Sequence, residues 1–516
     1  MRRIPLLAGT RVVLVPVADD DVVLHPPPPP ERVVDVDAAV RDALRFPLSG
    51  PPLERVAPRA GRVTIVVEPP ALPVPGGSRD PRATALAATL RELERCGVRG
   101  ERVTILVAGG LGRRLGRREL ETLLPPPEAR SFHGRVVVHD VEDAGLVPLF
   151  DDVRVSPELI ETDFVVTVTA AETVVHGGTG ALLGACDTAT VRRATGARSL
   201  LEAATAPAWA TATRLEGAIA SRAPLLGVSL VLDLPRIVGA FRGYPDDVET
   251  VQRVARSRSR AIFSRLPGVA RAEILGRLGR RLDATAAFAG PPSVAHAEAL
   301  VRGVELRGVR LAQPVDALVV GVPWVGPHLP RARPNPVTAA SLALGLAARL
   351  YRNASPIREG GTLVLVHPLT RTFARHETPY VALLEALRTR EPAALAAAER
   401  AVASDAAAIA SYRRGEACHP LLPFADWAAC VPALSRLGAV VVAGCRDALA
   451  ARALGLVPSH GVGSALEMAH GLAGGRARLG VLLAPPYAPL IVGEEEPDAR
   501  ARATNAQVPA PQSSPR

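Results

Sequence analysis

Short runs of β-branched residues alternate with segments of helical periodicity, and this alternation constrains the fold more than any other feature of the chain. Four runs suit strands buried on both faces, because nearly every position in them is apolar. They are residues 61–69 (GRVTIVVEP), 101–110 (ERVTILVAGG), 134–140 (GRVVVHD) and 163–172 (DFVVTVTAAE). Residues 36–46 and 81–96 have the spacing of amphipathic helices. Strands joined by helices predict a parallel sheet with ligands at the carboxyl ends of its strands.

The same rhythm restarts in the second half of the chain. Strand-like runs occupy residues 314–323, 360–368 and 437–444, and helices are predicted over residues 337–351 and 380–412. We predict an α/β protein of two domains, each a mainly parallel sheet with flanking helices. The predicted boundaries are residues 1–290, residues 291–492, and a polar disordered tail at 493–516. The loops after Val67, Val107, Val168 and Val322 are expected to line a cleft between the domains.

Composition excludes several classes of partner. The net charge is +10, but only 3% of residues are aromatic, so a platform for base stacking is missing and no nucleic-acid partner is expected. The longest apolar stretches, such as residues 437–445, are about half as long as a membrane span, so no membrane partner is expected. Arg11 and the run from Asp19 to Asp21 interrupt a signal-like N-terminus, which predicts a cytoplasmic protein.

The chain contains no lysine: all 61 basic residues are arginine. This excludes a Schiff base, a lysyl amide or a catalytic lysine anywhere in the protein. The five cysteines form no C-x-x-C pair, so the sequence indicates neither a disulfide framework nor a zinc ribbon.

Several segments, taken in order, resemble the nickel-dependent lactate racemase family. They include VTIVVEPPALPVP, RVTILVAGGLGRR, VVVHDVEDAGL and DFVVTVTAAETVVHGGTGALLG in the first half, and PVDALVVGVP, GEACHP and VGSALEMAHG in the second. The resemblance covers roughly residues 35–480. It implies racemisation or epimerisation of a 2-hydroxy acid, an isomerase reaction, by a nickel-pincer nucleotide attached to a lysine. Two histidines would then act as general acid and base.

The sequence departs from the family pattern at most of these positions. Leu72 stands at the family's arginine and Gly112 at one histidine, although Arg113 remains. Thr179 or Gly180 falls at the cofactor lysine and Thr195 at the metal histidine. In the second half Asn335 matches, whereas Thr338 and Ser341 replace a glutamine and a lysine. Covalent attachment of the cofactor is therefore excluded, and the metal remains unknown.

The glycine-rich segment after residue 171 is the strongest site candidate. Glu172 and His176 end a predicted strand and, with Arg113, are the catalytic candidates. The cofactor-binding candidates are the four residues that open the next helix: Gly177, Gly178, Thr179 and Gly180. Their backbone N–H groups could form an anion nest, with His176 gaining charge below about its ordinary pKa of 6.5. The alternative is a turn whose glycines serve only close packing.

Further candidates follow other strands. Arg113 could pair with a carboxylate or a phosphate, or lie on a solvated face beside three more arginines. His139 precedes Asp140, which would cap the next turn, so a structural role is favoured for this pair. Glu68, His139, Asn335 and His328 are the residues expected at the substrate cleft. His367, His376 and Glu377 could form a metal set, although their spacing fits no standard motif.

Two functions remain open. The chain is either a divergent enzyme of the racemase fold that acts on a small acid, or a catalytically silent relative that binds a small anion or a protein partner. Since the missing groups act as one unit in the family, ordinary lactate racemisation is not expected. The sequence does not determine the oligomeric state.

Overall fold

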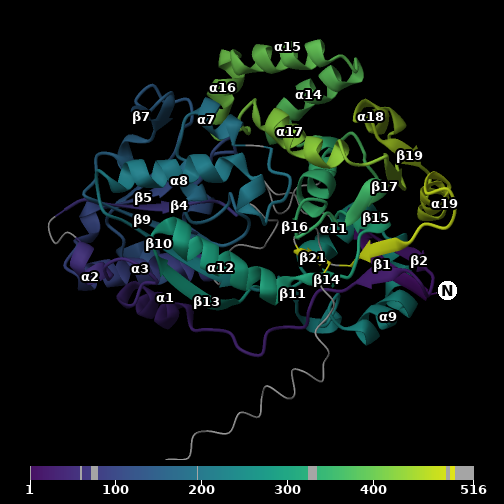
Figure 1. Cartoon of the computed structure of the whole chain (residues 1–516), viewed down its shortest axis with the longest axis horizontal. Coiled ribbons are helices and arrows are strands. Elements are labelled where there is room, and N and C mark those ends of the chain that lie inside the picture. The colour runs from purple at the N-terminus through teal and green to yellow at the C-terminus, as the bar shows by residue number, and fades with distance from the viewer. Residues whose placement is uncertain are drawn as a thin grey trace, which may run out of the picture.

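The computed structural model describes residues 2–57, 61–70, 80–194, 196–323, 334–483 and 488–493. Two six-stranded sheets organise them side by side (Figure 1). The first sheet has the order β13 (Ala284–Gly290), β10 (Leu225–Leu232), β9 (Phe164–Ala170), β4 (Val63–Val67), β5 (Val103–Val107) and β6 (Arg135–Val138). All its pairs are parallel except β13 with β10. The α/β prediction is confirmed.

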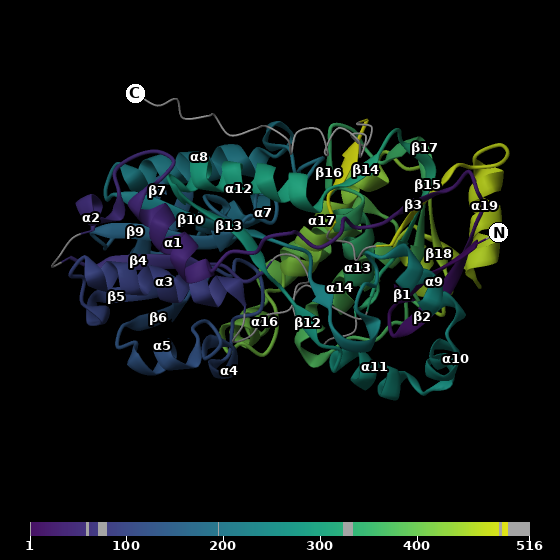
Figure 2. The same ribbon diagram turned by 90° about the horizontal axis from the view of Figure 1, so that it is seen from below.

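Helices cover both faces of the first sheet, which is why its central strands β4 and β9 are buried at every position. Alternate residues of β4 face opposite ways. Ile65 packs in one core with helices α1 (Val36–Arg45) and α3 (Pro81–Arg95), while Val66 packs in another with α6 (Gly180–Leu183) and α8 (Pro207–Ala220). This packing directs the carboxyl ends of β4, β5 and β9 toward the second half of the molecule (Figure 2).

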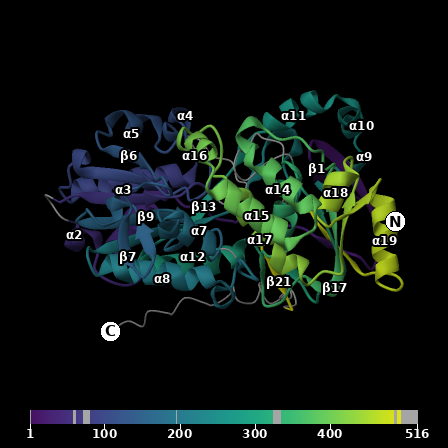
Figure 3. The same cartoon turned by 90° about the horizontal axis from the view of Figure 1, so that it is seen from above.

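The second sheet is parallel throughout. Its order is β19 (Val457–Ser459), β18 (Ala439–Ala443), β17 (Ile357–Val366), β15 (Val315–Gly321), β20 (Leu479–Leu482) and β3 (Val22–Leu24). One face packs on α19 (Val462–Leu472), and the other on α14 (Pro379–Arg388) and α17 (Leu422–Leu434). Figure 3 shows α14, α15 (Pro392–Ala403) and α17 gathered on this half.

The first residues of the chain lie in the second half, not in the first. Strands β1 (Arg2–Ala8) and β2 (Arg11–Val17) form a hairpin, the Gly9 amide donates to the Val322 carbonyl at 2.7 Å, and β3 pairs with β20. The sequence prediction placed residues 1–290 in one domain, because strand periodicity does not reveal the sheet to which a strand adds. An extended connector then crosses to α1 (Figure 2).

Several further elements lie at the seam between the two halves. Helix α12 (Pro292–Arg307) packs on β10 of the first sheet, and β21 (Leu490–Val492) pairs with β14 (Val309–Leu311) and β16 (Tyr351–Arg352). Helix α16 (Ala406–Arg413) reaches the first half beside α4 (Arg117–Leu120), where Arg413 pairs with Asp140 at 2.9 Å (Figures 2 and 3). Across the described part of the chain, no helix combines the length and apolarity needed to span a bilayer.

Candidate functional site

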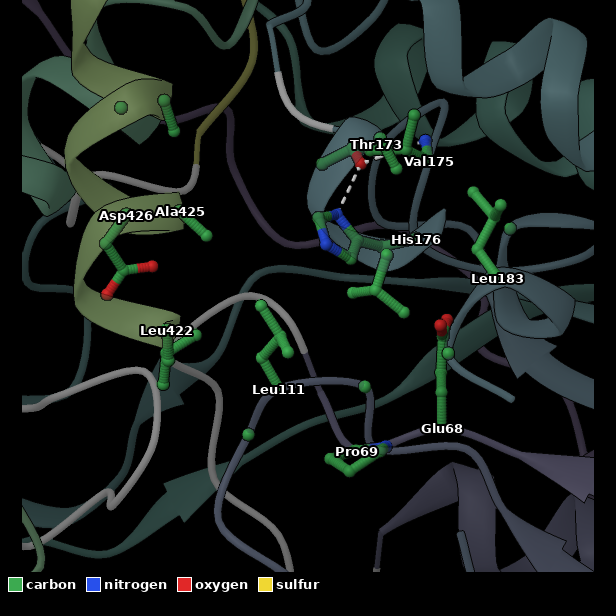
Figure 4. A pocket seen from close by; sticks show the side chains of 18 of the residues that line it. Glu68, Pro69, Leu111, Thr173, Val175, His176, Leu183, Leu422, Ala425 and Asp426 are labelled. Carbon is green, nitrogen blue, oxygen red and sulfur yellow. Dashed lines mark hydrogen bonds between the residues drawn. The ribbon is translucent and has the colours of Figure 1, made fainter. Parts of the chain in front are cut away.

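A cavity of about 380 Å³ lies between the two sheets. The loops that follow Val67, Val107 and Val168 line it from the first half. The π-helical segment η5 (Ser341–Ala347) and helix α17 line it from the second (Figure 4). The segment after Pro323, with the candidate His328, lies outside the described residues. The carboxyl edge of the first sheet therefore faces α17 across this cavity, as expected for ligand sites of parallel sheets.

Glu68 enters the cavity directly after β4. Its side chain is half-buried and points toward the loop that carries His176 (Figure 4). Burial raises the pKa of the Glu68 carboxyl well above its ordinary value, and the nearby charge of Glu172 raises it further. Arg82 and a hydrogen bond from the Gly177 backbone oppose this shift without cancelling it. The carboxyl consequently holds its proton at pH values where an exposed glutamate is ionised.

His176 lines the same cavity above Glu68. Thr173 Oγ1 lies 2.9 Å from His176 Nδ1, and this hydrogen bond sets the orientation of the ring (Figure 4). Nε2 is then the ring atom available to a ligand. Burial lowers the pKa of His176 to about 4, helped by the charges of His296 and Arg349. The sequence expectation of a charge below about pH 6.5 is therefore wrong: the imidazole is neutral over the physiological range.

Glu172, expected beside His176 in the site, does not line the cavity. Its carboxylate pairs with Arg82 Nη1 at 3.2 Å, and Arg82 also pairs with Asp80 at 2.5 Å. Glu172 is buried and absent from the cavity wall. The negative charge of Glu172 nevertheless raises the pKa of Glu68 and so favours its protonated form.

The glycine-rich loop is packed too closely to act as an open anion nest. A Cβ on Gly177 would lie 2.3 Å from the Ala170 carbonyl oxygen, and one on Gly178 would lie 2.2 Å from the Cβ of His296. Gly178 N–H donates to Thr169 Oγ1 at 2.7 Å, and Gly180 N–H to the Gly177 carbonyl at 2.9 Å. These N–H groups are occupied, so the packing alternative describes them better.

Arg113 lies at the edge of the cavity but turns toward the seam. Its guanidinium forms an ion pair with Glu119 and lies 3.5 Å from the Gly415 carbonyl of the second half. The expected position beside the glycine-rich loop, free to receive an anion, is not what the structure shows.

His139 and Asn335 have structural partners. His139 is buried, with Nε2 at 2.8 Å from the Cys186 carbonyl, and burial lowers its pKa. Asp140 accepts from the Glu142 amide at 3.0 Å, as the capping interpretation predicts. Asn335 caps α13 (Pro336–Ala340) by accepting from the Thr338 amide at 3.0 Å. Neither His139 nor Asn335 contributes to the wall of the cavity.

Two cavity residues of the second half were missed by the sequence reasoning. Asp426 on α17 faces the cavity opposite His176 and accepts a 2.5 Å hydrogen bond from the buried Tyr380 hydroxyl (Figure 4). Arg349 follows η5 and is buried, and its guanidinium donates to the carbonyls of Ala197, Gly345 and Ala429. Burial lowers its pKa to about 10. An aspartate within an apolar helix such as α17 carries no motif that would have identified it.

Comparison with known proteins agrees with the fold. Residues 9–181 match the sequence profile of the lactate racemase N-terminal domain. That segment is similar to the lactate racemase N-terminal domain. The lactate racemase apoprotein of Thermoanaerobacterium thermosaccharolyticum has the same fold, with a TM-score of 0.58, 15% identity, and coverage of 96% of this chain and 100% of that chain. A Thermotoga maritima protein aligns with a TM-score of 0.48 and 10% identity over 89% of this chain and 100% of its own. No curated protein sequence matches the chain significantly.

The residues present do not fit the lysine-linked nickel-pincer nucleotide that the family resemblance implies. The chain has no lysine, and the Thr179 hydroxyl at the corresponding position is turned away, donating to the Ala212 carbonyl at 2.8 Å. Within the described ranges, no three His, Cys, Asp or Glu side chains are arranged to hold a metal ion, so His367, His376 and Glu377 do not form the set considered from the sequence. Leu72 and Thr195 lie outside those ranges.

Proposed function

We propose that this lactate-racemase-like chain binds a small organic acid in the cavity and exchanges protons with it through Glu68 and His176, in place of the lysine-dependent reaction. The observation that carries the proposal is the meeting of a protonated carboxyl and a neutral imidazole in one cavity. Two titratable groups whose pKa values are shifted in opposite directions are the usual arrangement for acid–base chemistry.

The two groups have complementary roles in this proposal. Glu68 donates its proton toward the ligand carboxylate as negative charge develops there. His176 Nε2 accepts the proton from the carbon that bears the hydroxyl, and the reverse transfers return both protons. The bound carboxylate raises the pKa of His176 from about 4 toward the neutral range, because an opposite charge favours the imidazolium. Thr173 keeps the ring in place during the transfer.

The partner in this proposal is a small acid or phosphate in a cytoplasmic setting, not nucleic acid or a membrane. The low aromatic content and the scattered arginines support that choice.

A catalytically silent relative that binds a small anion or a protein partner is the second candidate. The ion pair of Arg113 and the occupied N–H groups of the glycine-rich loop favour it, since both remove donors that a family member would use. Binding without proton exchange would identify this case.

The test combines calorimetry with exchange of the α-proton of 2-hydroxy acids in deuterated solvent. Glu68→Gln keeps a neutral hydrogen-bonding group, so we expect binding within about two-fold and a loss of exchange on the order of 10²-fold or more. His176→Asn should lose exchange similarly. Glu121→Gln and His460→Asn change exposed residues of the same types and should leave both unchanged. Failure of every acid to bind at millimolar concentration would refute the proposal.

A further inference from the structure

The wall of the cavity is mainly apolar, and both halves of the molecule supply it. Leu111 and Leu183 come from the first half, and Leu342, Leu346 and Leu422 from the second. Further apolar lining residues are Leu115, Val175, Val191, Leu200, Ala425 and Ala429. Figure 4 shows Leu111, Leu422 and Ala425 between the Glu68–His176 side and Asp426.

Most polar groups of the described wall have partners or are neutral, although the buried Nε atoms of Arg113 and Arg349 have none. Asp426 accepts from Tyr380, and Arg113 pairs with Glu119. Arg349 donates to three backbone carbonyls. Glu68 and His176 are the other titratable groups of the described wall, and both lie toward one side of the space (Figure 4). A ligand that fills the cavity would therefore make polar contacts at one end and apolar contacts along the rest.

The size of the cavity points the same way. At about 380 Å³ it falls in the range of sites that enclose a ligand of drug size, whereas a three-carbon hydroxy acid would leave most of the leucine wall uncovered. Water in contact with that wall is released only by a ligand with a longer carbon chain.

We propose that the ligand is a hydroxy acid with an apolar body of several carbons, held with its polar head at Glu68 and His176 and its chain against Leu111, Leu342, Leu346 and Leu422. This inference rests on the proposed function, because the head group is the acid assigned there. It adds that the apolar wall of the interdomain cavity selects long-chain acids over lactate.

The experiment compares three probes on the full chain by calorimetry: lactate, 2-hydroxyhexanoate and 1-hexanol. Each methylene buried on binding contributes about four-fold in affinity, so the three additional carbons of 2-hydroxyhexanoate should tighten binding about sixty-fold relative to lactate. Hexanol should bind weakly in the same space, displaced by 2-hydroxyhexanoate.

The outcomes separate this inference from the proposed function. Equal affinity for lactate and 2-hydroxyhexanoate would overturn the inference and leave the proposed function standing. Binding of hexanol without binding of either acid would show that the apolar wall of the cavity holds a carbon chain, and it would overturn the proposed function. Absence of binding by all three probes would overturn both.

Two variants locate the effect in the cavity. Ala425→Leu places a larger side chain where Figure 4 shows the Ala425 methyl facing the cavity, and Leu346→Asn makes one wall polar. Each should weaken 2-hydroxyhexanoate at least ten-fold and change lactate by less than about two-fold. Val431→Leu, on the same helix at a side chain 51% exposed, is the matched control. Unchanged affinity for 2-hydroxyhexanoate in both folded cavity variants would overturn the inference.

Discussion

Replacing Gly178 with alanine should destabilise the protein strongly, because this loop is a packing element. Gly178 has φ +53°, and its added Cβ would lie 2.2 Å from the Cβ of His296 and 2.7 Å from the Pro292 carbonyl oxygen. The left-handed conformation costs alanine about 1–2 kcal/mol. Overpacking against the buried His296 adds roughly 1–3 kcal/mol. We expect a total of about 2–5 kcal/mol.

Gly455 is the matched control for the backbone term. It has φ +71° and nothing within 4 Å of its added Cβ, so Gly455→Ala should cost only about 1–2 kcal/mol. Urea unfolding of both variants measures the difference, which isolates the contact with His296. Equal destabilisation by the two substitutions would show that the loop has room at Gly178, and the open anion nest would regain support.

Three further predictions address charge, hydrogen bonding and the cofactor. Burial lowers the pKa of His367 to about 4, so the unfolded chain, with a pKa near 6.5, takes up the proton first and stability falls as pH drops from about 6.5 to 4. Urea unfolding should show that the free energy of unfolding falls between pH 7.5 and pH 5, and that this fall is about 2 kcal/mol smaller in His367→Gln than in the parent. An equal fall in both proteins would contradict the lowered pKa of His367. Tyr380→Phe removes the 2.5 Å bond to Asp426 and should cost about 1.5–3 kcal/mol in the same assay, more than Tyr244→Phe, whose hydroxyl donates to the uncharged Pro5 carbonyl. Intact mass should equal that of the unmodified sequence, because the chain has no lysine to carry a covalently linked cofactor; a covalent adduct would contradict this prediction.

The alternation of strands and helices could be predicted from the sequence because runs of mainly β-branched residues such as that of β4 belong to sheets covered on both faces. The sheet that a strand joins could not. Strand β3 has only three residues and pairs with β20, more than four hundred and fifty positions later, in the parallel register Val22 to Gly480. Local periodicity contains no information about such a partner.

The site was predicted in part. Glu68 and His176 follow strands whose carboxyl ends meet at one edge, so their neighbourhood was foreseeable from topology alone. The low pKa of His176 and the raised pKa of Glu68 were not, because both depend on burial beneath elements far away in the sequence. The ion pair of Arg113 could not be foreseen for a related reason: its partner Glu119 lies six positions on, but only the fold determines whether the two side chains meet.

The most direct test of the account is the titration of His176 itself. In protein labelled at its histidine rings, the signal of His176, assigned by its absence in His176→Asn, should stay in its neutral form from pH 8 to pH 5.5 and titrate near pH 4. Addition of 2-hydroxyhexanoate at pH 7 should shift that signal and leave the exposed His460 unchanged. Titration of free His176 near pH 6.5, or a His176 signal that ignores every acid, would contradict the account.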